Sequence, residues 1–137
     1  MKIAICGSMT FSKEMVKIAD KLKQNNHEVI LPRYAEKYAS MILTSEISHE
    51  SVKNKISHDL IRDYFNKIKN SDAVLIVNLD KNGIKNYIGG NSFLEMGFAH
   101  VLNKSVFLLN DIPDMPYNDE IKIMQPVILN NNLNRIK

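Results

Sequence analysis

The sequence has little of several features, and each shortage excludes a class of protein. A single cysteine, Cys6, excludes an internal disulfide and fits a reducing compartment. No apolar run approaches the roughly 20 residues that a membrane helix needs, so no membrane association is expected. The net charge is only +3 and the lysines are scattered, which argues against binding to a nucleic-acid polymer.

What remains is the composition of an ordinary soluble protein. Hydrophobic residues make up 45% and charged residues 24% of the chain, and a length of 137 residues suits one domain, 1–137, with a real core. The apolar start at residues 1–6 is too short for a signal peptide and is typical of a strand. We therefore expect a single-domain cytoplasmic protein.

Strand and helix patterns alternate along the chain. Apolar runs predict strands at residues 3–6, 28–31, 72–79, 106–109 and 126–129, and helical periodicity predicts helices at 12–25, 52–70, 91–103 and 119–124. The buried side of the second helix is expected to hold Ile56, Leu60, Ile61, Tyr64, Phe65 and Ile68. Residues 33–48 have a mixed composition without a firm period, which indicates an irregular loop with a short helix. The polar C-terminal tail is expected to fray.

This alternation predicts a flavodoxin-like α/β domain, a doubly wound five-stranded parallel sheet in the order 2-1-3-4-5. The near-continuous apolar run at 72–79 suits a strand that is covered on both faces. In such sheets a ligand binds beyond the carboxyl ends of the strands, at the switch point between strands 1 and 3. The loop at 7–11 should therefore lie beside the loop after the third strand and the start of the helix that carries Glu95.

Glu95 lies near the start of a predicted helix that a glycine pair precedes. Gly89 and Gly90 allow backbone angles and close approaches that other residues avoid, and Asn91 or Ser92 is a suitable N-cap. The helix dipole favours an ionised carboxylate there, which suits a nucleophile or an electrostatic stabiliser better than a proton donor. The structural alternative is an ordinary acid in a first helical turn.

The loop after the first strand is a second candidate site. Gly7, Ser8, Met9 and Thr10 lead into a helix at Ser12, so backbone N–H groups and two hydroxyls there could hold an anion. The glycines and the lysine of a Walker loop or a dinucleotide fingerprint are absent. The alternative is a simple strand-to-helix turn with Ser12 as its cap.

No metal site is expected, because His49 and His58 have no metal-ligand spacing and Cys6 has no partner. Asp59 and Asp63 are four residues apart and share one face of the second predicted helix. Either carboxylate could face the cleft, or both could belong to a solvated face.

Several short motifs follow one another in a fixed order. They are Cys6-Gly7-Ser8, Ser71-Asp72-Ala73-Val74, Glu95-Met96-Gly97-Phe98-Ala99 with Lys104, and, more weakly, Ile112-Pro113-Asp114 and Ile121-Lys122-Ile123-Met124. In this order they resemble the nucleoside 2-deoxyribosyltransferases and the related deoxynucleoside 5'-monophosphate N-glycosidases. The Glu95 motif is similar to that family's Glu-x-Gly-Tyr-Ala, with Phe98 in place of the tyrosine. The resemblance spans nearly the whole chain.

The resemblance implies an enzyme that cleaves or transfers the N-glycosidic bond of a (deoxy)nucleoside or its 5'-monophosphate, without a metal or organic cofactor. It implies that Glu95 is the nucleophile attacking the anomeric carbon of the sugar. It also implies a homodimer or larger homo-oligomer in which a neighbouring subunit completes each site, here through Lys122. Contacts with the small-molecule substrate are expected from Gly7, Ser8, Met9, Thr10, Gly89, Asn91, Tyr64 and Lys122.

The chain departs from the family at several positions. Tyr64 stands where the family has its acid/base Asp, and Asp63, one residue away, becomes the candidate for that role, although one residue turns a helical side chain by about 100°. Gly89 replaces an acidic group of the transferases, and Thr10 replaces an arginine of the monophosphate branch. A nucleotide-binding or sensing module without turnover is therefore the alternative function, and an enzyme acting on another N-ribosyl compound is a third.

Overall fold

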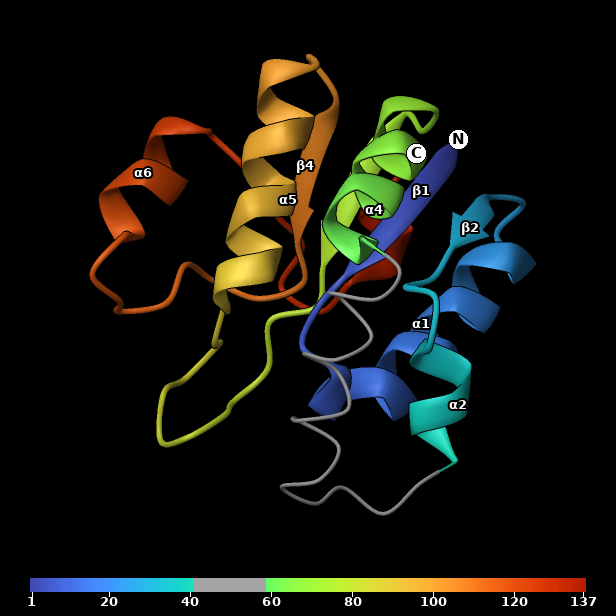
Figure 1. Ribbon diagram of the computed structural model, residues 1–137, viewed down its shortest axis with the longest axis horizontal. Helices are drawn as coiled ribbons and strands as arrows, with labels where there is room; N and C mark the ends of the chain where they lie inside the picture. The colour runs from blue at the N-terminus through green and yellow to red at the C-terminus, as the bar shows by residue number, and fades with distance from the viewer. Residues whose placement is uncertain (41–58) are drawn as a thin grey trace.

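Five parallel strands form the centre of the protein, with helices on both faces of the sheet (Figure 1). The computed structural model describes residues 1–40 and 59–137. In chain order the elements are β1 (Lys2–Cys6), the 3-10 helix η1 (Met9–Phe11), α1 (Ser12–Gln24), β2 (Glu28–Ile30), α2 (Ala35–Ala39), α4 (Leu60–Lys69), β3 (Ala73–Ile76), α5 (Gly90–Val101), β4 (Ser105–Leu108), α6 (Asn118–Ile123), β5 (Val127–Ile128) and the 3-10 helix η2 (Leu133–Arg135). The strand order is β2-β1-β3-β4-β5, which confirms the predicted flavodoxin-like sheet.

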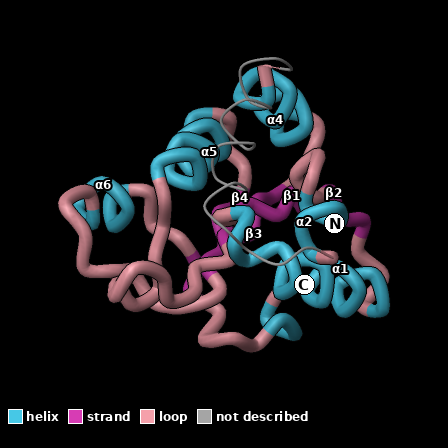
Figure 2. The backbone as a smooth tube through the Cα atoms, turned by 60° about the horizontal axis from the view of Figure 1, so that its bottom comes forward, coloured by secondary structure: helices cyan, strands magenta, loops and turns pink. Residues whose placement is uncertain are grey.

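The alternation of side chains along each strand divides the core into two layers. In β3, Ala73 and Leu75 pack into the layer of α1 and α2, whereas Val74 and Ile76 pack into the layer of α4, α5 and α6. Figure 2 shows α4, α5 and α6 on one side of the strands and α1 on the other. All four residues of β3 are buried, as its unbroken apolar run predicts.

The second predicted helix, 52–70, is interrupted at Asp59. α4 begins at Leu60, and Asp59 is its N-cap, with a left-handed φ of 46° that interrupts a helix at this point. The side chain of Asp59 accepts a hydrogen bond from the Arg62 N–H at 3.3 Å and pairs with the Arg62 guanidinium, so this acid serves as a cap. Residues 52–58 of the prediction lie outside the described residues. Ile61, expected to be buried, is 46% exposed.

The C-terminal tail does not fray as expected. After β5 the chain forms η2, and Leu133 and Ile136 are buried in the same layer as α1. Arg135 donates a hydrogen bond to the Ile128 carbonyl at 2.7 Å, and the Asn25 side chain donates one to Asn134 at 3.2 Å. Two apolar side chains in a polar segment are enough to anchor it, because each has a site in the core.

Two asparagines join the chain where β3 and β4 end. Asn78 is completely buried, and its side-chain amide donates to the carbonyls of Asn110 and Asp111, each at 3.0 Å. Its side-chain oxygen accepts from the Asn110 N–H at 2.9 Å, and the Asn110 amide donates back to the Asn78 carbonyl at 3.0 Å. This network fixes the carboxyl ends of two neighbouring strands.

We expect the Asn78→Ala substitution to lower the free energy of unfolding by about 2–4 kcal/mol, because it removes the three hydrogen bonds that the buried Asn78 side chain makes to the backbone of residues 110 and 111. Urea denaturation of both proteins measures the difference. Asn66→Ala, at an exposed position of α4, is the matched control and should change the stability by less than about 0.5 kcal/mol. Equal stability of the two variants would show that the asparagine network does not hold the strand ends together.

Candidate active site

A pocket lies at the carboxyl edge of the sheet, where β1 and β3 lead to helices on opposite faces. Four segments line it: Gly7 and Met9 after β1, Pro32, Arg33, Tyr34 and Tyr38 after β2, Leu60, Ile61 and Asp63 at the start of α4, and Asn91, Leu94, Glu95 and Phe98 on α5. The predicted meeting of the loop after the first strand with the Glu95 helix is therefore confirmed. The segment after β2, which contributes Pro32, Arg33, Tyr34 and Tyr38, was not predicted as part of the site.

Gly7 brings the first loop close against the sheet. A Cβ atom at this position would lie 3.1 Å from the Met15 sulfur and 3.3 Å from the Val77 carbonyl oxygen. A side chain here would need the Met15 sulfur and the Val77 carbonyl to shift by a few tenths of an ångström, so glycine suits this tight corner of the pocket.

Glu95 is partly buried and lies in the second turn of α5. The helix begins at Gly90 with Gly89 as N-cap and no side-chain cap bond, so the prediction that Asn91 or Ser92 caps it is wrong. Gly89 already has the extended backbone (φ −78°, ψ 172°) that a cap position needs, and the helix can start one residue earlier. Because the helix dipole acts mainly on the first turn, it influences Glu95 less than the sequence suggested.

The Cys6 thiol is buried, contacts the Ala4 carbonyl at 3.9 Å, and lies close enough to Glu95 for the carboxylate to affect its pKa. Burial raises the pKa of Cys6 well above its ordinary value, and the nearby Glu95 carboxylate raises it further. The thiol is therefore protonated at neutral pH. As a neutral group it adds no second charge near the carboxylate.

Tyr64 does not line the pocket, although it was expected to contact the substrate. Its side chain points to the sheet, is 5% exposed, and donates its hydroxyl hydrogen to the carbonyls of Ile5 and Ile30, the latter at 3.3 Å. Burial raises the pKa of Tyr64 well above 10, and nearby Cys6, Glu95 and Asp63 add to the effect. Tyr64 is thus a neutral structural residue under the site.

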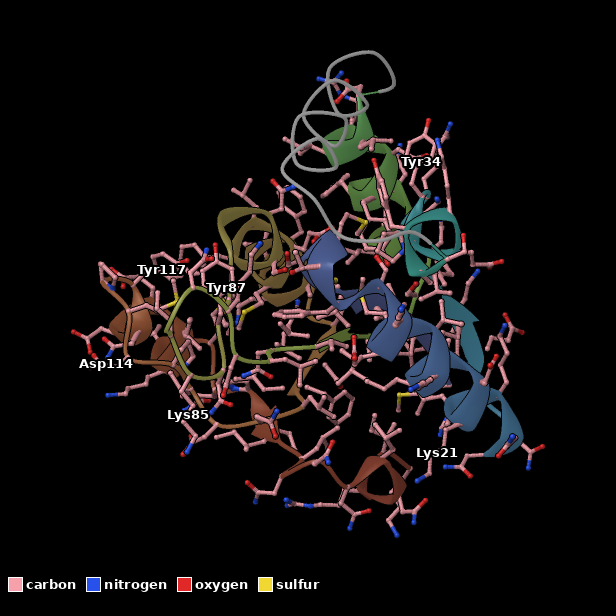
Figure 3. The ribbon with its side chains drawn as sticks, turned by 90° about the horizontal axis from the view of Figure 1, so that it is seen from below. Lys21, Tyr34, Lys85, Tyr87, Asp114 and Tyr117 are labelled. Carbon is pink, nitrogen blue, oxygen red and sulfur yellow. The ribbon has the colours of Figure 1, made fainter. Side chains whose placement is uncertain are left out.

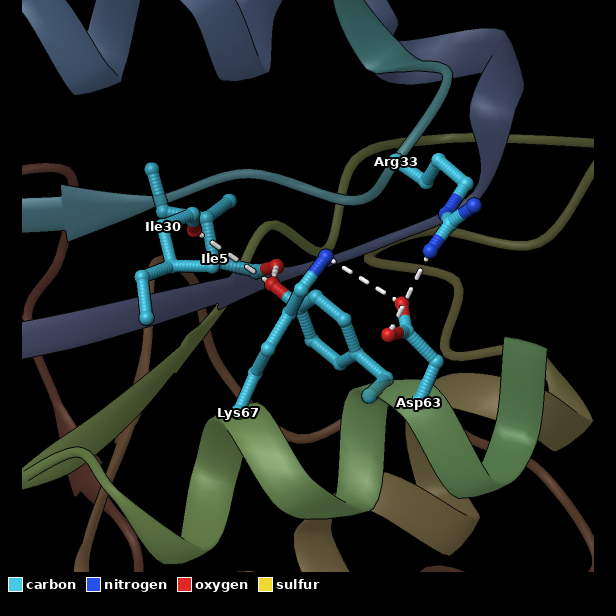
Figure 4. A network of polar contacts seen from close by, with 6 residues as sticks. Ile5, Ile30, Arg33, Asp63 and Lys67 are labelled. Carbon is cyan, nitrogen blue, oxygen red and sulfur yellow. Dashed lines mark hydrogen bonds and ion pairs between the residues drawn. The ribbon is translucent and has the colours of Figure 1, made fainter.

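Asp63, one residue earlier on α4, faces the pocket, because successive helical side chains point about 100° apart. Its carboxylate lies between two cations (Figure 4), with Arg33 Nη2 at 3.5 Å and Lys67 Nζ at 3.2 Å. The Asp63 side chain is 27% exposed, so solvent screens both ion pairs in part. Sequence reasoning missed both cations, although Arg33 begins the segment 33–48 that was predicted as an irregular loop with a short helix.

Of the other predicted site residues, three line the pocket, and Ser8, Thr10, Gly89 and Lys122 do not. Gly7, Met9 and Asn91 line the pocket with Glu95 and Asp63. Ser8 and Thr10 lie beside it, where their hydroxyl oxygens are 2.8 Å apart and Ser8 Oγ accepts from the Thr10 N–H at 3.4 Å. Gly89 packs against Tyr87, whose hydroxyl would lie 3.2 Å from a Cβ at Gly89. Lys122 is exposed on α6, away from the pocket of its own chain.

Within residues 1–40 and 59–137, no three His, Cys, Asp or Glu side chains gather into a metal-binding cluster. No helix in those same two ranges has the length and apolar character that crossing a membrane demands. His49 and His58 lie outside the described residues.

We expect the Cys6 thiol of the native protein to resist labelling by a disulfide reagent at about pH 8 and to react readily once guanidinium unfolds the chain. The reason is that burial both blocks access and keeps the thiol protonated. Absorbance of the released thiolate measures the two rates. Labelling of the native protein at the rate of the unfolded chain would show that Cys6 is not buried.

Two solved structures are similar to the chain. A 2-deoxyribosyltransferase of Bacillus psychrosaccharolyticus is 22% identical, with a TM-score of 0.48, over 79% of this chain and 71% of its own. The CMP N-glycosidase BcmB of Clostridium botulinum is 14% identical, with a TM-score of 0.42, over 79% of this chain and 70% of its own. No model of a known protein family and no curated protein matches the sequence. Function therefore has to be inferred from the residues of this chain.

Proposed function

We propose that the protein cleaves or transfers the N-glycosidic bond of a (deoxy)nucleoside or nucleotide, with the Glu95 carboxylate as nucleophile. The observation that carries this proposal is the position of Glu95 in a pocket at the switch point of the sheet, which Gly7 and Met9 also line. The motif around Glu95 supports the same role through its resemblance to the deoxyribosyltransferase family. Two neutral groups near Glu95, Cys6 and Tyr64, add no competing charge.

In this reaction a Glu95 oxygen attacks the anomeric carbon, the carbon–nitrogen bond breaks, and the electron pair leaves on the base, which takes up a proton from water. The developing oxocarbenium-like centre is positive, so an adjacent carboxylate stabilises it and then traps it as a glycosyl ester. Water or a second base then attacks the same carbon and releases Glu95. The choice between these acceptors separates hydrolysis from transfer.

Asp63 is the second carboxylate among the described residues of the pocket wall, and we propose that it is the acid/base group. Its ion pairs with Arg33 and Lys67 are made by the ionised form. That form suits the second step, in which Asp63 accepts the proton of the attacking water or base. Arg33, which also lines the pocket, can donate hydrogen bonds to an acceptor atom of the departing base.

The remaining walls suit the flat, apolar faces of a base and a sugar. They are formed mainly by the side chains of Met9, Pro32, Tyr34, Tyr38, Leu60, Ile61, Leu94 and Phe98. Apolar walls with a few polar groups are the usual composition of a small-molecule site. They exclude water from the reacting carbon and so strengthen the attraction between Glu95 and the developing charge.

A nucleotide-binding module without turnover is the second candidate. It is favoured by Tyr64, which occupies the position of the family's acid/base group but donates its hydroxyl to backbone carbonyls. On this alternative the Glu95 pocket binds the same ligands and leaves the glycosidic bond intact.

We expect the Glu95→Gln substitution to abolish release of free base, with a loss of several orders of magnitude in rate, because an amide cannot act as the nucleophile. The assay is incubation with a panel of nucleosides and 5'-monophosphates, followed by chromatography of the free base. Glu14→Gln, at an exposed position on the first turn of α1, is the control and should keep full activity.

Retention of the melting temperature shows that Glu95→Gln remains folded. A wild-type protein that releases base and a Glu95→Gln protein that does so equally fast would refute the role of Glu95. A wild-type protein that binds these ligands but releases no base from any of them would favour the binding module.

We further propose that Lys122 acts in the site of a neighbouring subunit, because α6 stands apart from α2 and α4 in its own chain (Figure 1). Glu95→Gln and Lys122→Ala proteins should each be inactive alone. If they exchange subunits as dimers, mixing equal amounts should restore about a quarter of the wild-type activity, since one site of each mixed dimer is intact. Sedimentation should show at least a dimer at micromolar concentration. A fully active monomer would exclude this arrangement.

A further inference from the structure

The loop between β3 and α5 carries a lysine back to the first loop of the sheet. Lys81 donates a hydrogen bond from Nζ to Ser8 Oγ at 2.8 Å, and the same ammonium lies 5.3 Å from the ring centroid of Tyr87. Ser8 Oγ in turn contacts the Thr10 hydroxyl at 2.8 Å. A cation and two hydroxyls from loops that are distant in the sequence thus meet beside Gly7 and Met9, the residues that line the Glu95 pocket.

A short hairpin fixes the position of this lysine. Lys81 and Ile84 pair through both backbone hydrogen bonds, at 3.0 and 2.9 Å, and Asn82 and Gly83 between them have φ values of 54° and 75°. Two successive residues with positive φ form the turn that best matches the twist of paired strands, and Asn-Gly is its preferred sequence. The backbone that carries Lys81 is therefore held in place before any ligand arrives.

The ends of the loop are also tied to the domain. The Tyr87 N–H donates to the Leu79 carbonyl at 2.8 Å, and the Asn86 N–H donates to the Asp80 carboxylate at 3.0 Å. Tyr117 donates its hydroxyl hydrogen to the Ile88 carbonyl, next to the start of α5. These bonds give the loop a single course from β3 to the Glu95 helix.

We infer that Lys81, with the hydroxyls of Ser8 and Thr10, binds an anionic group on the substrate, a phosphate monoester at the 5' position of the sugar. This inference rests on the proposed function, and it names a 5'-monophosphate as the preferred substrate class. An ammonium adds little binding free energy to a neutral sugar hydroxyl. A phosphate forms a stronger, charge-assisted hydrogen bond with it and has several acceptor oxygens. Ser8 and Thr10 are neutral, and Lys81 supplies the positive charge from another loop.

The test compares 2-deoxyribose 5-phosphate with 2-deoxyribose, two probes that carry no base and need no turnover. Affinities are measured by calorimetry or by chemical-shift titration on the full chain. In the wild type the phosphorylated sugar should bind more tightly. Lys81→Gln should weaken its binding by roughly 10- to 150-fold, the range that a hydrogen bond to a charged group supports, and should leave the binding of 2-deoxyribose unchanged.

Two further variants make the test specific to the side chain. Lys81→Arg keeps the charge and should retain most of the affinity for the phosphorylated sugar. Lys85→Gln removes the same charge from an exposed position on the same loop, well apart from Tyr87 (Figure 3), and should bind both probes as the wild type does. Melting temperatures of the variants check that the loop is intact.

Equal wild-type affinities for the two probes would overturn the inference, as would equal losses for both probes in Lys81→Gln, which would make Lys81 a tie between two loops. Either result leaves the proposed function standing if base is released from nucleosides and Glu95→Gln abolishes that release. Failure of the wild type to bind either probe would also overturn the inference. Failure to bind or cleave any nucleoside or nucleotide would remove the proposed function itself.

Discussion

The parallel pairing of β1 with β3 is the constraint on which the candidate site depends. Cys6 pairs with Ile76, and the Val77 N–H donates to the Cys6 carbonyl at 2.8 Å, so the two strands stay together to their last residues. Beyond that point the segment after β1 leads to α1 on one face of the sheet, and the segment after β3 leads to α5 on the opposite face. The opening between them is a consequence of topology, and the side chains that line it need only the right chemistry.

The charges around this opening suit the substrate that we propose, which is anionic at one end and becomes cationic at its reacting carbon. Near Glu95 the side chains of Cys6 and Tyr64 are neutral. Cations lie at two other places, with Arg33 and Lys67 beside Asp63 and Lys81 beside Ser8. In the proposed reaction, the neutral groups near Glu95 leave its carboxylate free of a second competing charge, while the cations attract an anion to the site.

The parts that hydrophobic periodicity determines could be predicted from the sequence, namely five strands, their order and the edge at which Gly7 and Glu95 meet. The positions of the cations Arg33, Lys67 and Lys81 could not be predicted, because the sequence does not distinguish a basic side chain that points to the site from one that points to solvent. Two signals were nevertheless available. Asn78 interrupts a strongly apolar run, which indicates a buried polar network, and Asn82-Gly83 is a strong hairpin signal. The cap at Asp59 depends on a left-handed backbone angle that no local pattern showed.

The order of Asp63 and Tyr64 on α4 has a structural reason. The paired register of β1 and β2 ends at Ala4 and Ile30, and there the Tyr64 hydroxyl contacts the carbonyls of Ile5 and Ile30. A carboxylate at position 64 would be too short to reach them and would place a charge in a buried layer, which is costly without a cation beside it. Position 63 lies about 100° away on the helix, where the pocket, Arg33 and Lys67 provide both solvent and counter-charge. The carboxylate therefore stands at the one of these two neighbouring positions where its charge is stable, and the tyrosine takes the position where a neutral donor is needed.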